Sequence, residues 1–241
     1  MIEQQDKLAF PKSESWKIFN EIAVRYDLLN RILSWGMDLC WRRQMAKFLN
    51  SRPDQTILDL ATGTADVPLA LVKSNPNVMT AVGIDLADKM LEHGRLKIAQ
   101  KNLTQKIKLQ HGDIHQLPFT DHSFDCTTIA FGIRNVLNPK KVLAEMFRVL
   151  RPGGRALVLE FSLASARPIR LLQLFYLRNI VPAAGFLLSG HYKAYRYLNQ
   201  TIEKFPYGTD FCRMMEDAGF KRVAFHPLFL QTATIYQGDK V

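Results

Sequence analysis

Cysteine is scarce in this chain, and its spacing excludes two common frameworks. Cys40, Cys126 and Cys212 are the three cysteines among 241 residues, and no two of them have the CxxC spacing. An odd and widely spaced set argues against a disulfide framework and against a structural zinc site, so we expect no metal. Residues 1–7 are polar and lack the apolar core of a signal peptide. We therefore expect a protein of the reducing cytosol.

Long hydrophobic runs are also missing. Hydrophobic residues make up 47% of the chain and charged residues 22%, as in ordinary globular proteins. The most apolar segment has an uncharged run over residues 179–190, and twelve residues are too few to span a bilayer. We find no internal repeat, no low-complexity tract and no second domain boundary. The sequence therefore predicts one domain over residues 1–241.

Acidic residues are in deficit. Asp and Glu number 22 against 32 Lys and Arg, which gives a formal charge of +10. A basic surface attracts nucleic acid and anionic lipid alike, and a generally basic solvated surface explains the charge equally well. No aromatic-basic RNA motif and no NPPY-type base-methylation motif accompanies the charge. We therefore expect no nucleic-acid partner, and a nucleic-acid-binding module remains an alternative that rests on net charge alone.

The hydrophobic pattern predicts a parallel sheet covered by helices. Apolar residues at three- and four-residue steps predict helices over residues 16–33 and 39–49. Short β-rich runs then alternate with helical stretches, which is typical of an α/β fold, and the strands are nearly continuous apolar runs, as burial on both faces requires. The predicted strands cover residues 56–60, 79–84, 107–111, 126–131 and 155–161, and the helices between them cover 67–73, 89–101 and 139–150.

After the fifth strand the alternation stops. Residues 167–198 have a helical and apolar pattern, and two more strands are predicted over 222–229 and 232–237. The connection between these strands is so short that they must pair antiparallel. We predict a Rossmann-like, doubly wound α/β fold whose sheet is mostly parallel with an antiparallel last strand. N-terminal helices within residues 1–50 and a helical insertion over residues 163–205 complete it.

The turn after the first strand is a candidate ligand cradle. Residues 57–66 join an apolar strand, the acid Asp59 and a small-residue turn with Gly63 that opens a helix. In open α/β sheets ligands bind beyond the carboxyl ends of the strands, and small residues let the backbone approach them. Asp85 ends the second strand 22 residues after Gly63, where a carboxylate can bridge two ribose hydroxyls. We therefore expect a nucleoside cofactor.

The charges of this turn select the cofactor. A dinucleotide fingerprint needs GxGxxG, and this turn instead carries Asp66 and a proline. Asp59 and Asp66 repel an anion at the helix start and attract a sulfonium with an ammonium tail, which favours S-adenosylmethionine over NAD. The third strand is followed by Asp113 and Ile114, a seat for adenine and its amine. Helix capping by Asp59 and Asp66 and a turn at Asp113 are the structural alternatives.

Two segments carry a family resemblance. Residues 26–36 read YDLLNRILSWG and continue to Trp41. Residues 148–154 read RVLRPGG, and LEFS follows at 159–162. On these segments the chain resembles the menaquinone and ubiquinone biosynthesis C-methyltransferase family, over roughly residues 16–238.

The resemblance implies a class I S-adenosylmethionine-dependent methyltransferase fold. It also implies methylation of a ring carbon on a polyprenyl quinol, most simply demethylmenaquinol to menaquinol or the corresponding benzoquinol of the ubiquinone pathway. The cofactor contacts carried over to this chain are Thr64, Asp85, Asp113 and Ile114.

Five positions depart from the family pattern. Ala130 replaces a serine that contacts the cofactor, and Leu29 replaces a Met. Ala65 replaces a glycine of the cofactor turn, at a cost of about 1 kcal/mol if its φ is positive. Asp38 stands where the family has His, and Lys193 stands near a usually acidic position. These departures keep open a methyltransferase of the same fold with another small aromatic or lipid acceptor, and Ala65 alone keeps open a scaffold without cofactor binding.

Arg134 and Asn135, at the end of the fourth strand, are the candidate catalytic residues. A quinol ring becomes nucleophilic at carbon once a hydroxyl loses its proton, because the phenolate pushes charge onto the adjacent carbon. Arginine is a poor base, but it can stabilise a phenolate or orient a water that takes the proton, while Asn135 fixes the oxygen. The structural alternative is an ion pair between Arg134 and Glu160.

Residues 1–50 are predicted to form a helical lid, and the first part of this segment, residues 1–15, is predicted to be a loose leader. Tyr26 and Asn30 lie four residues apart and share a helix face that can close over the cofactor. Ordinary packing of Tyr26 is the alternative.

The insertion over residues 163–205 is predicted to form a substrate and membrane arm. Tyr195 and Tyr197 are expected to border the entrance for the quinol. Since a polyprenyl tail lives in the membrane, we expect the arm to dock on anionic lipid at the inner membrane face. A buried helical hairpin and a homodimer interface are the alternatives. The basic residues that flank the arm are Arg167, Arg170, Arg178, Lys193 and Arg196.

Overall fold

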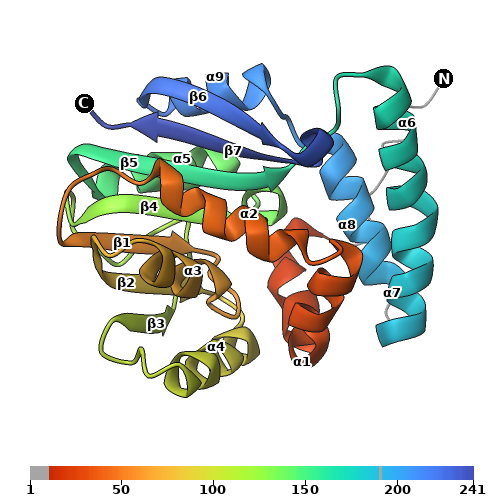
Figure 1. Ribbon diagram of the computed structural model, residues 1–241, viewed down its shortest axis with the longest axis horizontal. Coiled ribbons are helices and arrows are strands. Elements are labelled where there is room, and N and C mark those ends of the chain that lie inside the picture. Colours follow the sequence, from red (N-terminus) through yellow and green to blue (C-terminus); the bar gives the residue numbers. More distant parts are fainter. Residues whose placement is uncertain (1–10, 190–191) are drawn as a thin grey trace.

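The computed structural model describes residues 11–189 and 192–241, apart from the side chains of residues 13 and 186–196. At its centre lies a seven-stranded sheet with the strand order β3-β2-β1-β4-β5-β7-β6 (Figure 1). β7 pairs antiparallel with β5 and β6, and the other neighbouring strands pair parallel. The strands are β1 (Gln55–Leu60), β2 (Val78–Asp85), β3 (Ile107–His111), β4 (Phe124–Ala130), β5 (Leu150–Phe161), β6 (Lys221–Leu228) and β7 (Ala233–Asp239).

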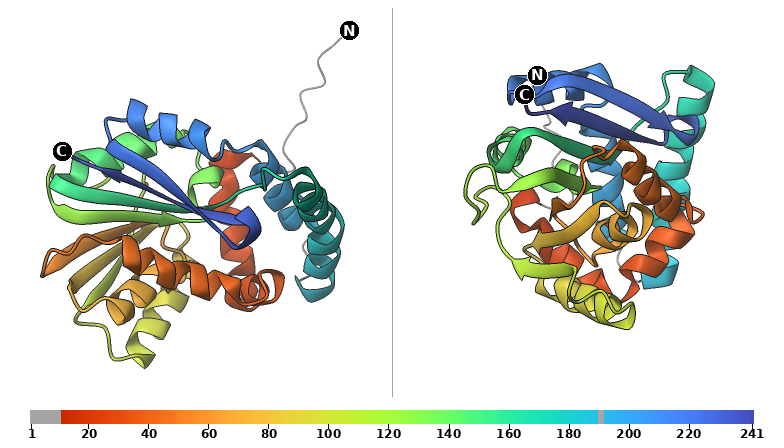
Figure 2. Two further views of the ribbon diagram at one scale, coloured as in Figure 1. Left: turned by 45° about the horizontal axis from the view of Figure 1, so that its top comes forward. Right: turned by 60° about the vertical axis from the view of Figure 1, so that its left-hand side comes forward.

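Helices cover both faces of the sheet and the edge where the parallel strands end (Figure 2). The α-helices are α1 (Ser15–Leu33), α2 (Met37–Met45), α3 (Asp66–Ser74), α4 (Asp88–Gln100), α5 (Pro139–Val149), α6 (Arg167–Phe175), α7 (Val181–Ser189), α8 (Tyr192–Lys204) and α9 (Thr209–Asp217). Shorter turns are the 3₁₀ segments η1 (Lys12–Glu14), η2 (Ala46–Phe48), η3 (Ile133–Asn135) and η5 (Phe229–Gln231) and the π-turn η4 (Tyr176–Ile180).

The alternation of side chains along the strands divides the core into two layers. In β1, Leu58 packs in the layer that holds α5 and α9, while its neighbour Ile57 packs in the layer that holds α2 and α3. The first layer contains Met146 of α5 and Phe211 of α9, both fully buried. These strands are apolar on both faces because helices cover both faces.

Helix α1 and the arm, residues 163–205, lie beyond the carboxyl ends of the parallel strands (Figure 1). Leu29 of α1 and Val181 of α7 are buried in one small cluster that joins the two parts. The hydroxyl of Tyr176 donates a hydrogen bond to the carbonyl oxygen of Leu33 at 2.9 Å. The arm thereby closes over the end of α1 and encloses space at this edge of the sheet.

A π-turn interrupts the arm between α6 and α7. In η4 the amide of Val181 donates to the carbonyl oxygen of Tyr176, five residues back. The side-chain amide of Asn179 donates to the carbonyl oxygen of Phe175 at 2.9 Å, which gives that carbonyl a partner. Pro182 follows at once, and it has no N–H and a ring that clashes with an α-helical carbonyl. The wider π-turn accommodates the proline within one rod.

The predicted fold class is confirmed. The predicted strands appear in order, and the last two pair antiparallel. β5 begins at Leu150 rather than at the predicted residue 155, because Leu150 already pairs with Phe124 of β4, and the RPGG segment forms a bulge before pairing resumes at Arg155. The N-terminal helices and the helical insertion are both present.

Gly94 of α4 allows a close approach that gives a test of this packing. A Cβ atom at Gly94 would lie 2.7 Å from Leu109 Cδ1 and 3.2 Å from the carbonyl carbon of Thr64. Alanine favours a helix by roughly 1 kcal/mol over glycine, but a contact against backbone outweighs that gain. We expect Gly94→Ala to lower the free energy of unfolding by about 1–3 kcal/mol in urea denaturation.

The control is Leu96→Ala at an exposed position of the same helix, which should change the free energy of unfolding by less than about 0.5 kcal/mol. A Gly94→Ala protein as stable as the wild type would contradict the close approach of α4 to the turn after β1.

Candidate active site

Two adjoining cavities lie beyond the carboxyl ends of β1, β2, β3 and β4. The smaller encloses about 250 Å³ between these strand ends and the start of α1. The larger encloses about 620 Å³ between α1, α2 and the arm. The residues that line both cavities are Phe19, Tyr26, Phe131 and Asn135. A compound in one cavity therefore lies next to a compound in the other.

Four of the predicted cofactor residues line the smaller cavity: Gly63, Asp85, Asp113 and Ile114. The carboxylate of Asp85 accepts hydrogen bonds from the backbone amides of Gly63 at 2.8 Å and Ala87 at 2.9 Å. Burial raises the pKa of Asp85, and these amides oppose the rise. A fixed carboxylate at this strand end is placed to accept hydrogen bonds from two ribose hydroxyls.

Asp113 organises its own loop at the end of β3. Its Oδ1 accepts a hydrogen bond from the backbone amide of His115 at 2.9 Å and lies 2.7 Å from the ring Nδ1 of that histidine. Burial acts to raise the pKa of Asp113, but the two contacts with His115 outweigh it, and the pKa is lowered. The loop presents a carboxylate and the apolar Ile114 to one space, as an adenine with its amine requires.

Backbone strain gathers where the cavities meet the strand ends. Ala61, Ala65 and Phe131 have positive φ values of 49°, 65° and 57°. In residues with a side chain this conformation costs roughly 1–2 kcal/mol, so Ala65 carries the strain expected where the family has glycine. Phe131 follows β4 directly, and its conformation leads into η3, which carries Arg134 and Asn135 to the cavities. Such strain persists only where the surrounding structure enforces it.

Two predicted cofactor residues, Asp59 and Thr64, line neither of these cavities. Asp59 is 1% exposed and accepts a hydrogen bond from Thr128 Oγ1 at 2.6 Å. Burial raises its pKa to about 7. The Thr64 hydroxyl donates to Asp27 at 2.7 Å beneath α1. Alternation along β1 turns the side chain of Asp59 into a covered layer, and its role in binding a cationic ligand stays a prediction.

Five charged side chains fasten α1 to α2, α3 and α4, and we call them the α1 network: Asp27, Arg31, Asp38, Asp66 and Lys97. Arg31 donates to Asp66 at 2.6 Å and also pairs with Asp38. Lys97 donates to Asp27 at 2.7 Å and also pairs with Asp66. Burial acts to raise the pKa of Asp66, but the nearby cations, Arg42, Lys97 and Arg31, lower it to about 2. Asp66 therefore binds cations of the protein itself.

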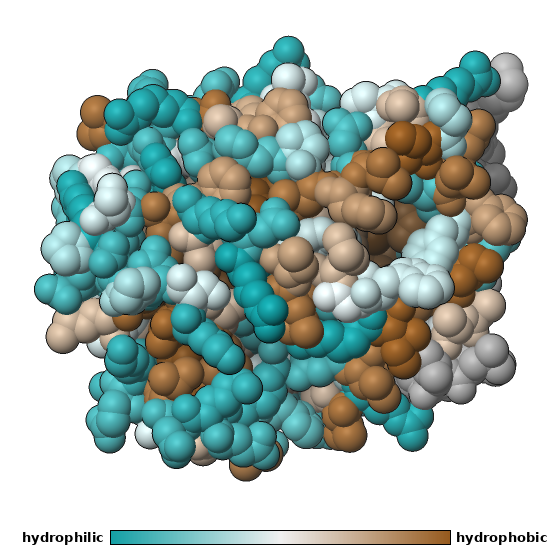
Figure 3. Space-filling model, in the orientation of Figure 1, coloured by the Kyte–Doolittle hydropathy of each residue, from teal (hydrophilic) through white to brown (hydrophobic). Residues whose placement is uncertain are grey.

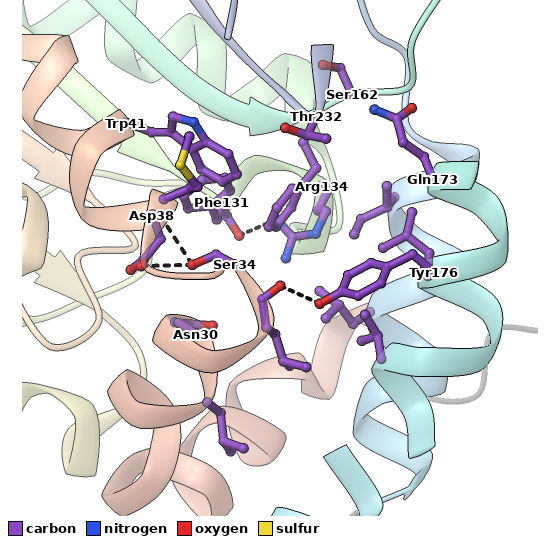
Figure 4. Close-up of a pocket in the computed structure, with 18 of the residues that line it drawn as sticks. Asn30, Ser34, Asp38, Trp41, Phe131, Arg134, Ser162, Gln173, Tyr176 and Thr232 are labelled. Carbon is purple, nitrogen blue, oxygen red and sulfur yellow. Dashed lines mark hydrogen bonds between the residues drawn. The ribbon is translucent and has the colours of Figure 1, made fainter. Parts of the chain in front are cut away.

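Arg134 lines the larger cavity, and Asn135 lines both. Arg134 Nη1 donates to the carbonyl oxygen of Phe131 at 2.7 Å (Figure 4). The same Nη1 donates to Glu160 Oε1 at 2.5 Å. The side-chain amide of Asn135 donates to the same carbonyl at 3.2 Å. Arg134 thus both lines the larger cavity and forms an ion pair with Glu160, which holds its guanidinium in place.

Helix α2 adds a second charged pair to the larger cavity. The hydroxyl of Ser34 donates to Asp38 Oδ1 at 2.9 Å (Figure 4). Arg42 Nη1 donates to Asp38 Oδ2 at 2.6 Å. Asp38 is 3% exposed and Arg42 is 5% exposed. The acid at the position where the family has His is therefore a buried acceptor held by cations.

Four residues were predicted to belong to the lid or to contact the substrate, and the structure describes the side chains of all of them except Tyr195. Tyr26 lines both cavities, and Asn30 and Tyr197 line the larger one. Burial raises the pKa of Tyr26 and that of Tyr197. Tyr195 lies in α8, but its side chain is outside the described residues.

The segment expected to be a loose leader contributes to the smaller cavity. Lys12 of η1 and Ser15 at the start of α1 line this cavity. The backbone of the predicted leader is described from residue 11 onward. Gln173 and Tyr176 of the arm line the larger cavity (Figure 4). The sequence pattern singled out none of these four, because each belongs to a polar or helical stretch without a local motif.

The two cavities differ in chemistry. The larger is mostly apolar, with the guanidinium groups of Arg42 and Arg134 among its few charges. Such a space can hold an apolar aromatic compound and stabilise negative charge on its oxygen. In the described part of the chain, no three His, Cys, Asp or Glu side chains are grouped to hold a metal ion.

Comparison with known proteins gives consistent matches. The model of the ubiE/COQ5 methyltransferase family matches residues 9–240. A Geotalea daltonii protein named ubiquinone/menaquinone biosynthesis C-methyltransferase UbiE is 42% identical over 93% of this chain and 95% of its own. A Thermus thermophilus demethylmenaquinone methyltransferase is 42% identical over 92% of this chain and 100% of its own.

A solved structure from Thermotoga maritima has the same fold. It is described as an S-adenosylmethionine-dependent methyltransferase, possible histamine N-methyltransferase, and superposes with a TM-score of 0.65. It covers 94% of this chain and 100% of its own at 17% identity, so the likeness concerns the fold alone.

Asp59 allows a pH test of its burial. Its pKa of about 7 lies above the ordinary 3.8, so between these values the folded protein binds a proton that the unfolded chain has lost. Stability therefore falls as the pH rises through this window. Between about pH 5 and pH 8, we expect the free energy of unfolding to fall by about 2 kcal/mol more in the wild type than in Asp59→Asn, in urea denaturation. Equal pH dependence in both proteins would contradict the raised pKa.

Proposed function

Because this chain belongs to the ubiE/COQ5 methyltransferase family and is an S-adenosylmethionine-dependent C-methyltransferase of quinone biosynthesis, we propose that its acceptor is a polyprenyl quinol, most simply demethylmenaquinol. The observation that carries this proposal is that Phe131 and Asn135 line both cavities, so the cofactor side adjoins an apolar space of about 620 Å³. That volume is in the range of pockets for drug-sized ligands.

The residues of the smaller cavity fit S-adenosylmethionine. Asp85 would accept hydrogen bonds from the ribose hydroxyls, and Asp113 and Ile114 would contact the adenine. The turn at Gly63 allows the backbone to approach the amino-acid part, and Lys12 supplies a cation for its carboxylate. The cofactor supplies an electrophilic methyl group carried on a sulfonium.

Arg134 and Asn135 act on the acceptor ring in this proposal. Loss of a hydroxyl proton makes the neighbouring ring carbon nucleophilic, and the charge of the resulting oxyanion needs a partner. The guanidinium of Arg134 stabilises that oxyanion, while Glu160 fixes its position. Asn135 lines both cavities, so it can orient the oxygen at the place where acceptor and cofactor meet. The reaction then needs close alignment of the carbon with the methyl group. Once the methyl group has left the sulfur and bonded to the carbon, that carbon releases its own hydrogen as a proton, which restores the aromatic quinol.

Large apolar side chains surround the mouth of the larger cavity, and Figure 3 shows hydrophobic side chains around a hollow in this region. Trp35 is 85% exposed, Leu172 71%, Phe229 60% and Leu230 56%, although all four line the cavity. An apolar rim continuous with an apolar cavity gives a polyprenyl tail a way out. We propose that this rim, with the exposed Arg167, rests on the inner face of an anionic membrane. None of the described helices is long and apolar enough to cross a bilayer.

The acceptor is tested with purified protein, S-adenosylmethionine and chemically reduced demethylmenaquinone. We expect menaquinol and S-adenosylhomocysteine in equal amounts. Arg134→Lys should lower kcat by about a hundredfold, because it removes the forked donor that meets the oxyanion, with the Kd for S-adenosylmethionine within about threefold. Cofactor binding without transfer to the quinol would show that the acceptor is another compound.

The cofactor site is tested by titration calorimetry with S-adenosylmethionine. Asp85→Asn should raise the Kd by about tenfold or more, because a charged acceptor for the ribose hydroxyls is lost. Asp210→Asn, at an exposed position on α9, is the control and should leave the Kd unchanged. An unchanged Kd in Asp85→Asn would remove this residue from the cofactor site.

Membrane docking is tested by flotation with vesicles of phosphatidylethanolamine and phosphatidylglycerol. We expect the wild type to float with the vesicles, and the double variant Leu172→Ser and Phe229→Ser to bind at least about tenfold more weakly, because its rim has lost apolar area. Met79→Ser, also an exposed apolar position but at the start of β2, is the matched control and should bind like the wild type. Equal binding of all three proteins would contradict docking through the rim.

A further inference from the structure

One wall of the larger cavity carries two arginines against a pair of stacked rings. The rings of Phe131 and Phe161 have centroids 4.5 Å apart and an interplanar angle of 35°. The guanidinium carbon of Arg42 lies 5.2 Å from the Phe131 centroid, and that of Arg134 lies 5.1 Å from the Phe161 centroid. Both cationic groups therefore lie against this ring pair and border the same apolar space.

Both guanidinium groups have donors left for a ligand. The hydrogen bonds of Arg42 to described residues leave from Nη1, toward the carboxylate of Asp38 at 2.6 Å and its carbonyl oxygen at 3.0 Å. The side chain of Arg134 also bonds through Nη1, and its Nε is buried without a partner in the described part of the chain. A guanidinium has five N–H donors, so neither group is saturated by these contacts. The proposed function uses only Arg134.

Asp38 fixes the direction of Arg42. Its carboxylate takes hydrogen bonds from Ser34 and Arg42 and pairs with Arg31, and it is 3% exposed. An ionised carboxylate only accepts hydrogen bonds, so Asp38 itself cannot donate to an oxyanion. It can, however, compensate the charge of Arg42 and hold its side chain, which a buried guanidinium needs.

We propose that Arg42 is a specificity-determining residue, which donates a hydrogen bond to the second oxygen of a 1,4-dihydroxy aromatic acceptor, with Asp38 as its positioning residue. This inference rests on the proposed function, in which Arg134 serves the oxygen beside the accepting carbon. The two oxygens of a 1,4-quinol lie at opposite ends of the ring, and the two guanidinium groups lie against different members of the ring pair. An oxygen buried in an apolar cavity needs such a partner. The site thereby selects the diol over a ring with one hydroxyl.

The test compares two acceptors in one series of proteins. One acceptor is a short-chain 2-prenyl-1,4-naphthalenediol, kept reduced with dithionite, and the other is the 1-naphthol that keeps the hydroxyl beside the accepting carbon and lacks the second one. The ratio of their kcat/KM values is measured in the wild type and in Arg42→Gln. We expect the ratio to fall by about tenfold or more in Arg42→Gln, because only the diol loses a hydrogen bond to a charged donor.

Further variants separate recognition from folding. Arg42→Lys keeps a donor and should retain part of the preference, and Asp38→Asn should lower it by loosening Arg42. Arg178→Gln, an exposed arginine of the arm, is the control and should keep the wild-type ratio. Melting temperature and the Kd for S-adenosylmethionine identify any variant that fails to fold, in which case Arg42→Lys and Asp38→Asn provide the comparison.

The outcomes distinguish this inference from the function on which it rests. If the wild type transfers no methyl group to the diol, the proposed acceptor is wrong. If it does transfer, and Arg42→Gln reduces kcat/KM equally for both acceptors, Arg42 only supports the structure, and the inference is overturned.

Discussion

The shape of both cavities depends on the partly buried charges that hold α1 against the rest of the molecule. The α1 network joins this helix to three others through Arg31 and Lys97, and both cations share Asp66. Since α1 contributes lining residues to both cavities, its attachment sets the shape of both at once. Removal of one partner from such a network leaves an uncompensated charge, which costs about 3–5 kcal/mol where the charge is buried. The same ion pairs therefore determine both the shape of the cavities and the stability of the N-terminal region.

The sequence was most informative where local pattern and tertiary burial agree. The strands are apolar on both sides because helices cover both faces, so continuous apolar runs located them well. The predicted residues Asp85, Asp113 and Ile114 line one cavity because loops at the ends of parallel strands converge at one edge of the sheet. The N-terminal turn at Lys12 was missed, since its place at the cavity depends on long-range folding and leaves no periodic signal.

Charge was the less reliable guide. Asp59 lies within β1 and Asp66 begins α3, and neither carboxylate lines either cavity, because Asp59 is bonded to Thr128 in a covered layer and Asp66 belongs to the α1 network. A sequence shows that a carboxylate lies near a strand end, but it does not show which cation pairs with that carboxylate in the folded protein. Asp38 is a second example. It departs from the family pattern, yet its carboxylate is paired with Arg31, Arg42 and Ser34, which lie near it in the sequence.

The π-turn of the arm places a constraint on how this protein can change in length. A residue added to or removed from a helix rotates everything after it by about 100° relative to what came before. In the arm, Gln173 of α6, Tyr176 of η4 and Val181 of α7 all line the larger cavity, so both halves of the arm present one side to it. Small insertions or deletions there would turn part of that side away from the cavity. The length of the arm can therefore change without turning its cavity-facing side away only by about two helical turns, which is about seven residues at a time.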